Sequence, residues 1–152
     1  MSITEHNPSV LEQQFPGGFP HPKDGVVVTL LLIVSDQERS RDFYERVMGG
    51  QVVRERNPLM VRLHNIWLML NNGGPPTPDK PTITCAPPRD PSTLSVALNL
   101  RVSDFEAAVA EYKARGATLL APPVDWPHER RCYLQDPDGY IVEIGEFTKI
   151  DF

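Results

Sequence analysis

Glu143 is the residue whose type and place in this sequence point most directly to chemistry, because it stands in the strongly apolar stretch 140–144. The stretch follows the turn 136–139, in which a proline favours the second turn position and a glycine relieves the exit. Side chains alternate along a strand, so Glu143 faces away from its neighbours at 142 and 144. An unpaired buried carboxylate is costly or becomes protonated. Glu143 is therefore predicted to be a ligand-recognition group or base in a cavity, or one end of an ion pair with Arg62, Arg101 or Arg131.

The histidines offer little further chemistry. His6 and His21 lie in a polar N-terminal stretch, His64 falls at a predicted turn, and His128 lies in the loop before a predicted strand. Each is predicted to be a solvated surface residue, with His128 placed where it could fold over the mouth of a cavity. The histidines therefore suggest no metal site by themselves.

Composition excludes several classes of protein. The chain has 152 residues, a net charge of −5 and a pI near 5.3, which argues against a nucleic-acid partner. It contains no run of about 18 apolar residues that could span a membrane, and no secretory signal at its start. Cys85 and Cys132 are too few for a disulfide framework and are predicted to be free thiols in the cytoplasm. We expect Cys132 to be a small buried hydrophobic residue and not a nucleophile.

The elements that must position Glu143 form two similar sets. In the first, a strand at 26–34 precedes a helix that Ser35 caps, with Glu38 reaching back, and strands follow at 51–54, 59–63 and 66–71. In the second, a strand at 94–102 precedes a helix capped by Ser103, and strands follow at 117–120, 130–134 and 140–147. Both sets are predicted as βαβββ units.

Proline and glycine mark the boundaries between these sets. Residues 1–25 are predicted to be a flexible or extended arm, and residues 72–93 a linker without regular structure. The first module then covers residues 26–71 and the second covers 94–152. The two modules align at an offset of 68, which maps Val34-Ser35-Asp36 onto Val102-Ser103-Asp104 and Tyr44 onto Tyr112. An internal repeat is therefore predicted.

Residues 26–147 resemble the glyoxalase / bleomycin-resistance / ring-cleaving dioxygenase superfamily, also called vicinal oxygen chelate proteins. The residues that carry the resemblance are Leu32-x-Val34-x-Asp36 with Phe43-Tyr44, then Leu100-x-Val102-x-Asp104, and the turn Asp136-Pro137-Asp138-Gly139 followed by Glu143. The resemblance implies an α+β fold, in which two tandem βαβββ modules form curved mixed sheets around a cup with the helices on the outer face. The same scaffold supports many functions, so it does not choose one.

The resemblance also implies where a metal would bind. Enzymes of this family hold a divalent metal with a histidine, sometimes a glutamine, on the first strand of each repeat and a carboxylate on the last strand. The histidine positions here are Thr29 (36 − 7) and Ala97 (104 − 7), and the carboxylate position is Glu143, whose repeat partner is Met69. One carboxylate does not hold a catalytic metal. We therefore expect neither a metal nor another cofactor.

Strand alternation predicts which side chains line the cup if Thr29 and Ala97 point inward. Besides the catalytic or recognition residue Glu143, the predicted ligand-binding residues are Thr29, Leu31, Met60, Arg62, Trp67, Met69, Asn99, Arg101, Trp126, Arg131 and Tyr133. This set is apolar and aromatic with a few polar groups, as in a small-molecule pocket. Met60, Trp67 and Met69 are equally compatible with plain core filling.

The first hypothesis is a protein that binds a small organic molecule in a cup without a catalytic metal. The second is a lyase, isomerase or dioxygenase with a degenerate or metal-free site, which would use Glu143 as a base. The third is a regulatory or structural protein with no ligand. A homodimer is expected in each case, because the family usually buries its edge strands that way. The sequence leaves open whether the cup forms within one chain or across two.

Overall fold

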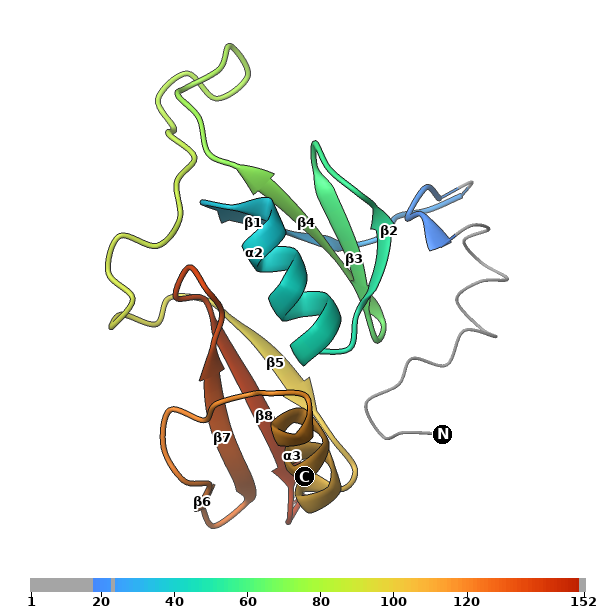
Figure 1. Ribbon diagram of the computed structural model, residues 1–152, viewed down its shortest axis with the longest axis vertical. Helices are drawn as coiled ribbons and strands as arrows, with labels where there is room; N and C mark the ends of the chain where they lie inside the picture. Colours follow the sequence, from blue (N-terminus) through green and yellow to red (C-terminus); the bar gives the residue numbers. More distant parts are fainter. Residues whose placement is uncertain (1–17, 23, 151–152) are drawn as a thin grey trace.

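The computed structural model describes residues 18–22 and 24–150, which form two four-stranded mixed sheets with helices packed on one face of each (Figure 1). The first module contains β1 (Thr29–Val34), α2 (Gln37–Arg41), η2 (Asp42–Val47), β2 (Gln51–Arg54), β3 (Leu59–Leu63) and β4 (Ile66–Asn72). The second contains β5 (Ala97–Arg101), α3 (Phe105–Ala114), β6 (Val124–Asp125), β7 (Glu129–Gln135) and β8 (Ile141–Phe147). The strand orders are β1-β4-β3-β2 and β5-β8-β7-β6, so the predicted pair of βαβββ modules is confirmed.

The registers of the two sheets show which residues are repeat equivalents. In each module the first and last strands pair in parallel, with Leu31 opposite Met69 in one and Asn99 opposite Glu143 in the other. Across the following antiparallel pairs, Met60 lies opposite Met69 and Tyr133 opposite Glu143. Met69 and Glu143 are therefore equivalent positions, and so are Met60 and Tyr133.

The helix caps lie one residue later than predicted. Asp36 is the N-cap of α2, and its carboxylate accepts hydrogen bonds from the backbone N–H groups of Glu38 and Arg39. Asp104 caps α3 in the same way through the N–H of Ala107. The prediction of serine caps is wrong because the carboxylate that follows each serine satisfies the free N–H groups at the helix start.

The strand predicted at 117–120 is also misplaced. Within residues 24–150, a single backbone hydrogen bond joins this stretch to β7, from the N–H of Leu120 to the carbonyl of Tyr133. Pro122 and Pro123 follow, and proline cannot donate to a ladder. The antiparallel partner of β7 is therefore the short strand β6. At the other end of the chain, β1 starts at Thr29 and not at residue 26, leaving Val26 91% and Val28 76% exposed.

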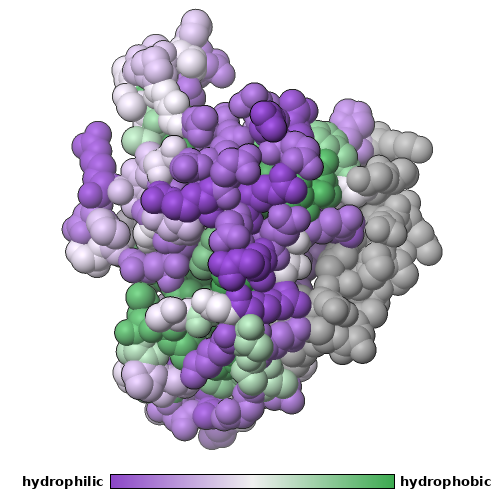
Figure 2. Space-filling view, in the orientation of Figure 1, coloured by the Kyte–Doolittle hydropathy of each residue, from purple (hydrophilic) through white to green (hydrophobic). Residues whose placement is uncertain are grey.

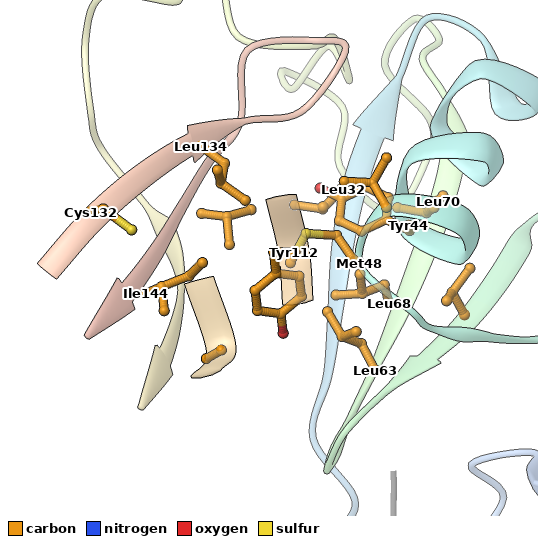
Figure 3. Close-up of a cluster of buried hydrophobic side chains, with 14 of the residues drawn as sticks. Leu32, Tyr44, Met48, Leu63, Leu68, Leu70, Tyr112, Cys132, Leu134 and Ile144 are labelled. Atoms are coloured by element: carbon orange, nitrogen blue, oxygen red, sulfur yellow. The ribbon is translucent and has the colours of Figure 1, made fainter. Parts of the chain in front are cut away.

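One shared core joins the two modules. It contains helix-facing residues of both sheets together with residues of both helices: Leu32, Leu63, Leu68 and Leu70 from the first sheet, Cys132, Leu134 and Ile144 from the second, and Tyr44, Met48 and Tyr112 (Figure 3). Cys132 lies in this core beside Leu134, as predicted. Because the modules bury these apolar side chains together, they depend on one another for stability.

Two tyrosines at the repeat offset join each helical region to the opposite module. The hydroxyl of Tyr44 donates to Asp136 Oδ2 over 2.7 Å, at the tip of the β7–β8 hairpin. The hydroxyl of Tyr112 lies 3.2 Å from His64 Nε2, at the tip of the β3–β4 hairpin. Burial raises the pKa of both phenols, that of Tyr112 to about 12, so both stay protonated at neutral pH. The hairpin turns therefore connect the modules.

Each sheet has a second face, opposite the one that packs on the helices, which we call its helix-free face. Alternation along the strands places Thr29, Leu31, Met60, Arg62, Trp67 and Met69 on the first helix-free face. It places Asn99, Arg101, Arg131, Tyr133, Ile141 and Glu143 on the second. The predicted cup lining therefore belongs to two faces that both point away from the shared core.

The segment between the modules, residues 73–96, contains isolated bridges, Gly74 with Cys85 and Thr77 with Lys80, and no strand. It runs along one side of the molecule from the end of β4 to the start of β5 (Figure 1). None of the helices in the described part of the chain is long and apolar enough to cross a membrane.

Candidate ligand-binding site

Glu143 lies on the second helix-free face and is almost entirely buried, with 9% of the residue exposed. Its Oε1 accepts hydrogen bonds from Arg101 Nη2 over 3.1 Å and from Asn99 Nδ2 over 3.2 Å. Of the ion-pair partners predicted for it, the structure thus gives Arg101. A cation and an amide therefore bind the buried carboxylate. These partners offset the free energy cost of placing a charged group in an apolar strand.

Glu129 joins the two arginines of this face. Its Oε2 lies 2.8 Å from Arg101 Nη2, and its Oε1 lies 2.8 Å from Arg131 Nη1. Burial tends to raise the pKa of this carboxyl, but hydrogen bonds from the two arginines outweigh it and lower the pKa. Glu129 therefore stays ionised at neutral pH and fixes both guanidinium groups.

Aromatic rings surround the charged groups. The guanidinium of Arg101 lies 4.4 Å from the ring centre of Phe147, and that of Arg131 lies 4.9 Å from Trp126 and 5.8 Å from Tyr133. Such cation–π contacts hold planar groups in stacked positions. Trp126 is 50% exposed and Phe147 is 55% exposed, so both rings keep area that a ligand can cover.

Tyr133 places a phenol among these groups. Burial, and then a hydrogen bond to the Glu143 carboxylate, raises the pKa of this phenol. The hydroxyl therefore remains protonated and can donate. Together the face offers a phenol, an amide, two guanidinium groups and two carboxylates.

The charges of this array cancel, since Arg101 and Arg131 stand against Glu129 and Glu143. A strongly anionic ligand would have to compete with carboxylates that already hold the guanidinium groups. The array is thus suited to a ligand that is neutral overall and brings hydrogen-bonding groups.

Hollows adjoin the margins of this face. One, of about 340 Å³, is lined by Asn99 and Arg101 together with His64, Asn65, Ser103 and Tyr112. Two others, of about 370 and 430 Å³, meet at Ile141 and involve the segment before β5. Exposed apolar residues of this module include Leu120 and Val124, and Figure 2 shows apolar surface over the second module at the lower left. These hollows adjoin the face at Asn99, Arg101 and Ile141, and none of the four described hollows is lined by Glu143, Arg131 or Tyr133.

The first helix-free face differs, because the chain itself covers it. Trp67, Arg62 and Met60 are 2%, 1% and 3% exposed. The indole N–H of Trp67 donates to the carbonyl of Gly18 over 2.7 Å, and Arg62 Nη2 donates to Gln51 Oε1 over 2.8 Å. Met69 and Thr29 remain partly exposed, and Leu31 is 52% exposed.

The structure thus separates the predicted ligand-binding residues into two groups. Asn99, Arg101, Arg131, Tyr133 and Glu143 form one connected array, with Trp126 stacked at its rim. The residues from the first module lie on the other sheet. None of the four hollows of 310–430 Å³ described in the structure is lined by members of both groups.

The residues present do not fit the metal that the resemblance implies. Thr29 donates its hydroxyl to Met69 Sδ over 3.6 Å, and Ala97 has no donor atom. Glu143 Oε1 already accepts two hydrogen bonds. Among residues 18–22 and 24–150, no three histidine, cysteine, aspartate or glutamate side chains form a group that could hold a metal ion.

Sequence reasoning missed Glu129, Phe147 and Gly18. Strand parity could have found Glu129, which shares a face with Arg131 and Tyr133, and Phe147, which shares one with Glu143. Gly18 contacts Trp67 at a separation of 49 positions in the sequence, and no local sequence pattern predicts such a contact.

Comparisons with known proteins agree with this architecture. The family model described as Glyoxalase/Bleomycin resistance protein/Dioxygenase superfamily matches residues 26–144. A glyoxalase/bleomycin resistance protein/dioxygenase from Nocardioides is 21% identical, with a TM-score of 0.66 over 86% of this chain and 89% of that one.

Two other solved structures carry more specific descriptions. TnmS3, an antibiotic binding protein from a Streptomyces species, is 24% identical, with a TM-score of 0.58 over 84% of this chain and 100% of its own. A lactoylglutathione lyase from Agrobacterium tumefaciens is 17% identical, with a TM-score of 0.61 over 81% of this chain and 94% of that one. At these identities the likeness shows a common fold.

Proposed function

The chain belongs to the glyoxalase/bleomycin resistance protein/dioxygenase superfamily, and from this premise we propose that it binds a small organic molecule on the second helix-free face. The observation that carries the proposal is the array around Glu143, in which the charges cancel and half-exposed aromatic rings form the rim. A face that only completed a core would not need buried, ordered charges beside exposed rings. The antibiotic binding protein among the similar structures shows that the fold can serve such a role.

The array favours a ligand with a flat conjugated part. Trp126 and Phe147 each present a ring that is about half exposed and already stacked on a guanidinium. A planar ligand can extend such stacks, which favour offset or edge contacts between rings. Glu143 would then accept a hydrogen bond from a hydroxyl or amine of the ligand, and the oxygen of Tyr133, whose O–H donates to Glu143, would accept one.

An enzymatic role would require Glu143 to remove a proton from the substrate. Such a lyase, isomerase or dioxygenase without a metal is the alternative function, and one of the similar structures is a lyase. The two hydrogen bonds that Glu143 Oε1 accepts favour recognition, because Arg101 and Asn99 hold this oxygen in a fixed position where it can contact a ligand. Turnover of a bound compound by wild-type protein, abolished in Glu143→Gln, would establish the enzymatic function instead.

A thermal-shift screen of planar aromatic compounds tests the proposal. A compound present at about 100 times its Kd stabilises the native protein by roughly 2.7 kcal/mol and raises its Tm. The matched variant is Trp126→Ala, because this exposed rim residue can be removed without opening the core. We expect compounds that raise the Tm of wild type and fail to raise that of Trp126→Ala. Equal shifts in both proteins would place the ligand elsewhere.

We also propose a cytoplasmic homodimer that binds no nucleic acid, consistent with its free cysteines and net charge of −5. Support for the dimer comes from β1, which is an edge strand preceded by exposed Val26 and Val28. Uncharged, apolar edges of this kind are usually covered. Sedimentation equilibrium at micromolar concentration should give twice the 17.1 kDa chain mass. A monomer that persists as the concentration rises would contradict this prediction.

The metal content provides another prediction. Because Thr29 and Ala97 offer no imidazole and Glu143 is held by Arg101, protein purified without chelator should carry far less than one equivalent of metal. Elemental analysis for zinc, iron, manganese and nickel measures this directly. Stoichiometric metal that a chelator removes together with ligand binding would contradict the proposed mode of recognition.

A further inference from the structure

The segment between the two modules, residues 73–96, is anchored close to the end of β4. The N–H of Cys85 donates to the carbonyl of Gly74 over 3.0 Å, and the carbonyl of Cys85 accepts the N–H of Gly74 over 2.9 Å. The same carbonyl lies so near Gly73 that no room is left there for a Cβ. The chain therefore leaves β4, makes an excursion and returns to a fixed point at Cys85 (Figure 1).

The second anchor of this segment is Pro91, which lies on the hairpin that joins β7 and β8. Its carbonyl accepts the side-chain N–H of Gln135 over 2.8 Å. Pro91 also packs on Gly139, where a Cβ would lie 2.7 Å from Pro91 Cβ. Figure 1 shows the segment passing beside the tip of this hairpin. Residues 86–90 thus connect two fixed points, so less entropy is lost in ordering them around a ligand than in a free loop.

A hollow of about 370 Å³ lies between this stretch and the β7–β8 hairpin, and we call it the intermodule hollow. Its lining comes from both sides and includes Pro88, Arg89, Thr93, Gly139, Tyr140 and Ile141. The volume lies in the range of small-molecule pockets. Since neither Glu143 nor Arg131 lines it, the intermodule hollow is separate from the array around Glu143.

Arg89 brings an unpaired positive charge to the intermodule hollow. Its side chain is exposed, and among residues 18–22 and 24–150 it makes no hydrogen bond or ion pair. Arg101 and Arg131, by contrast, are both held by Glu129. The guanidinium of Arg89 is therefore available to form two parallel hydrogen bonds with the carboxylate of a ligand.

The neighbouring carboxylate, that of Asp90, is engaged by the segment itself. Its Oδ1 accepts the hydroxyl and the backbone N–H of Ser92, and its Oδ2 accepts the hydroxyl of Thr93 over 2.9 Å. These hydrogen bonds, that of the Ser92 hydroxyl first, lower the pKa of Asp90, so the group stays ionised at neutral pH. Its charge repels a second negative group on a ligand, which favours a monoanion.

Apolar groups form the rest of the lining. Pro88 and Ile141 are partly buried, and Val96 is 55% exposed. The hydroxyl of Tyr140 donates to the carbonyl of Ile33 over 2.9 Å and accepts its N–H over 3.1 Å. The part of Tyr140 that remains for a ligand is thus its apolar ring. These groups suit a ligand whose body is apolar.

From these observations we propose that the intermodule hollow is a second small-molecule site, which takes a monocarboxylate with an apolar body. Arg89 holds the carboxylate, and the ring of Tyr140 packs against the body together with Pro88 and Ile141. The bound acid connects the intermodule segment to the β7–β8 hairpin and so stabilises the native protein. The proposal does not depend on the function assigned to the second helix-free face.

Benzoate is the probe, because it carries one carboxylate on an apolar ring. The full-length, isotope-labelled protein is titrated by NMR with benzoate, with benzamide, which lacks the charge, and with acetate, which lacks the ring. Arg89→Gln removes the charge, and Arg56→Gln is its matched control. Arg56 is also exposed, its guanidinium makes no hydrogen bond or ion pair in the described part of the chain, and it lines none of the four hollows.

We expect benzoate to shift the backbone amide signals of Ser95 and Gly139, which line the intermodule hollow, and to bind more tightly than benzamide or acetate. Wild type, Arg56→Gln and Trp126→Ala should share one Kd, because neither substitution touches the hollow. Arg89→Gln should bind benzoate about ten-fold more weakly, since the charge-assisted hydrogen bonds are lost. Its Tm without benzoate should equal that of wild type, because Arg89 is exposed.

Four results would overturn the proposal. Failure of wild type to bind benzoate at millimolar concentration would show that the intermodule hollow takes no such acid. The same Kd in Arg89→Gln and Arg56→Gln would remove Arg89 from the site. Benzamide or acetate binding as tightly as benzoate would show that the charge or the ring is not recognised. Loss of benzoate binding in Trp126→Ala would place the acid at the array around Glu143 instead.

Discussion

Replacing Asp136 by alanine should destabilise the protein by about 3–5 kcal/mol, because three hydrogen bonds end on this buried carboxylate. Oδ1 accepts the backbone N–H groups of Asp138 and Tyr140, each over 2.9 Å, and Oδ2 accepts the Tyr44 hydroxyl. Asp136 is only 5% exposed, so water cannot simply take its place. The loss should appear in urea denaturation as a lower midpoint with little change in slope.

Asp136→Asn is the matched control for this result. The amide oxygen can accept both backbone N–H groups, and the amide N–H can donate to the Tyr44 hydroxyl. We therefore expect Asp136→Asn to lie within about 1 kcal/mol of wild type at neutral pH. If Asp136→Ala were as stable as Asp136→Asn, the Asp136 hydrogen bonds would not hold the two modules together.

The same pair of proteins gives a pH dependence with a defined sign. Burial raises the pKa of Asp136 above its ordinary value of 3.8, although hydrogen bonds from Tyr44 and the backbone oppose this effect. The folded state therefore binds this proton more tightly than the unfolded state. Ionisation of Asp136 therefore lowers the free energy of unfolding. This loss is complete above the pKa that Asp136 has in the folded state, and it disappears as the pH falls below the unfolded-state value of 3.8. Wild type should accordingly gain stability relative to Asp136→Asn as the pH is lowered through this window.

Arg101→Ala should give the second large effect, a destabilisation of about 2–3 kcal/mol. Arg101 pairs with Glu143 over 3.1 Å and with Glu129 over 2.8 Å, and it covers Phe147. Its removal leaves the buried Glu143 carboxylate without its cation. The expected loss is smaller than for a fully buried pair because the Arg101 side chain is 33% exposed. Thermal melting at neutral pH measures it.

Arg41→Ala is the surface control, since Arg41 also bridges two carboxylates, those of Glu45 and Glu55. Those carboxylates are 46% and 67% exposed, so water can replace the arginine and the loss should be much smaller. Adding Glu143→Gln to Arg101→Ala should restore part of the lost stability, because no buried charge is then left alone. Equal losses in Arg101→Ala and Arg41→Ala would show that the Glu143 array is ordinary surface.

Most of the fold could be predicted from the sequence, because its signals are local. The alternation of Leu32 and Val34 and the spacing from Phe105 to Tyr112 identify strands and helices. The offset that maps Tyr44 onto Tyr112 reveals the repeat, and the structure shows that both residues contact the opposite module. Errors arose where neighbouring residues compete, as when Asp36 caps the helix in place of Ser35.

The candidate site was harder to predict because its contacts are not local. Parity placed Glu143 and Arg101 on one face, and the structure pairs them. Strand alternation could not show that the two sheets share one core. Because that core lies between the sheets, the first helix-free face is separated from the second. Nor could strand alternation show that Gly18 covers Trp67, since that contact depends on the path of the chain before β1.

The role of Glu143 tests the central proposal most directly, through titration of Glu143→Gln with the compound that most raises the wild-type Tm. Glutamine keeps an acceptor for Arg101 and Asn99, and Arg101 keeps Glu129, so folding should be nearly unchanged. Calorimetry should show a Kd at least ten-fold weaker than that of wild type, a loss of about 1.4 kcal/mol. A lowered Tm with an unchanged Kd would contradict the proposal and make Glu143 only a structural partner of Arg101.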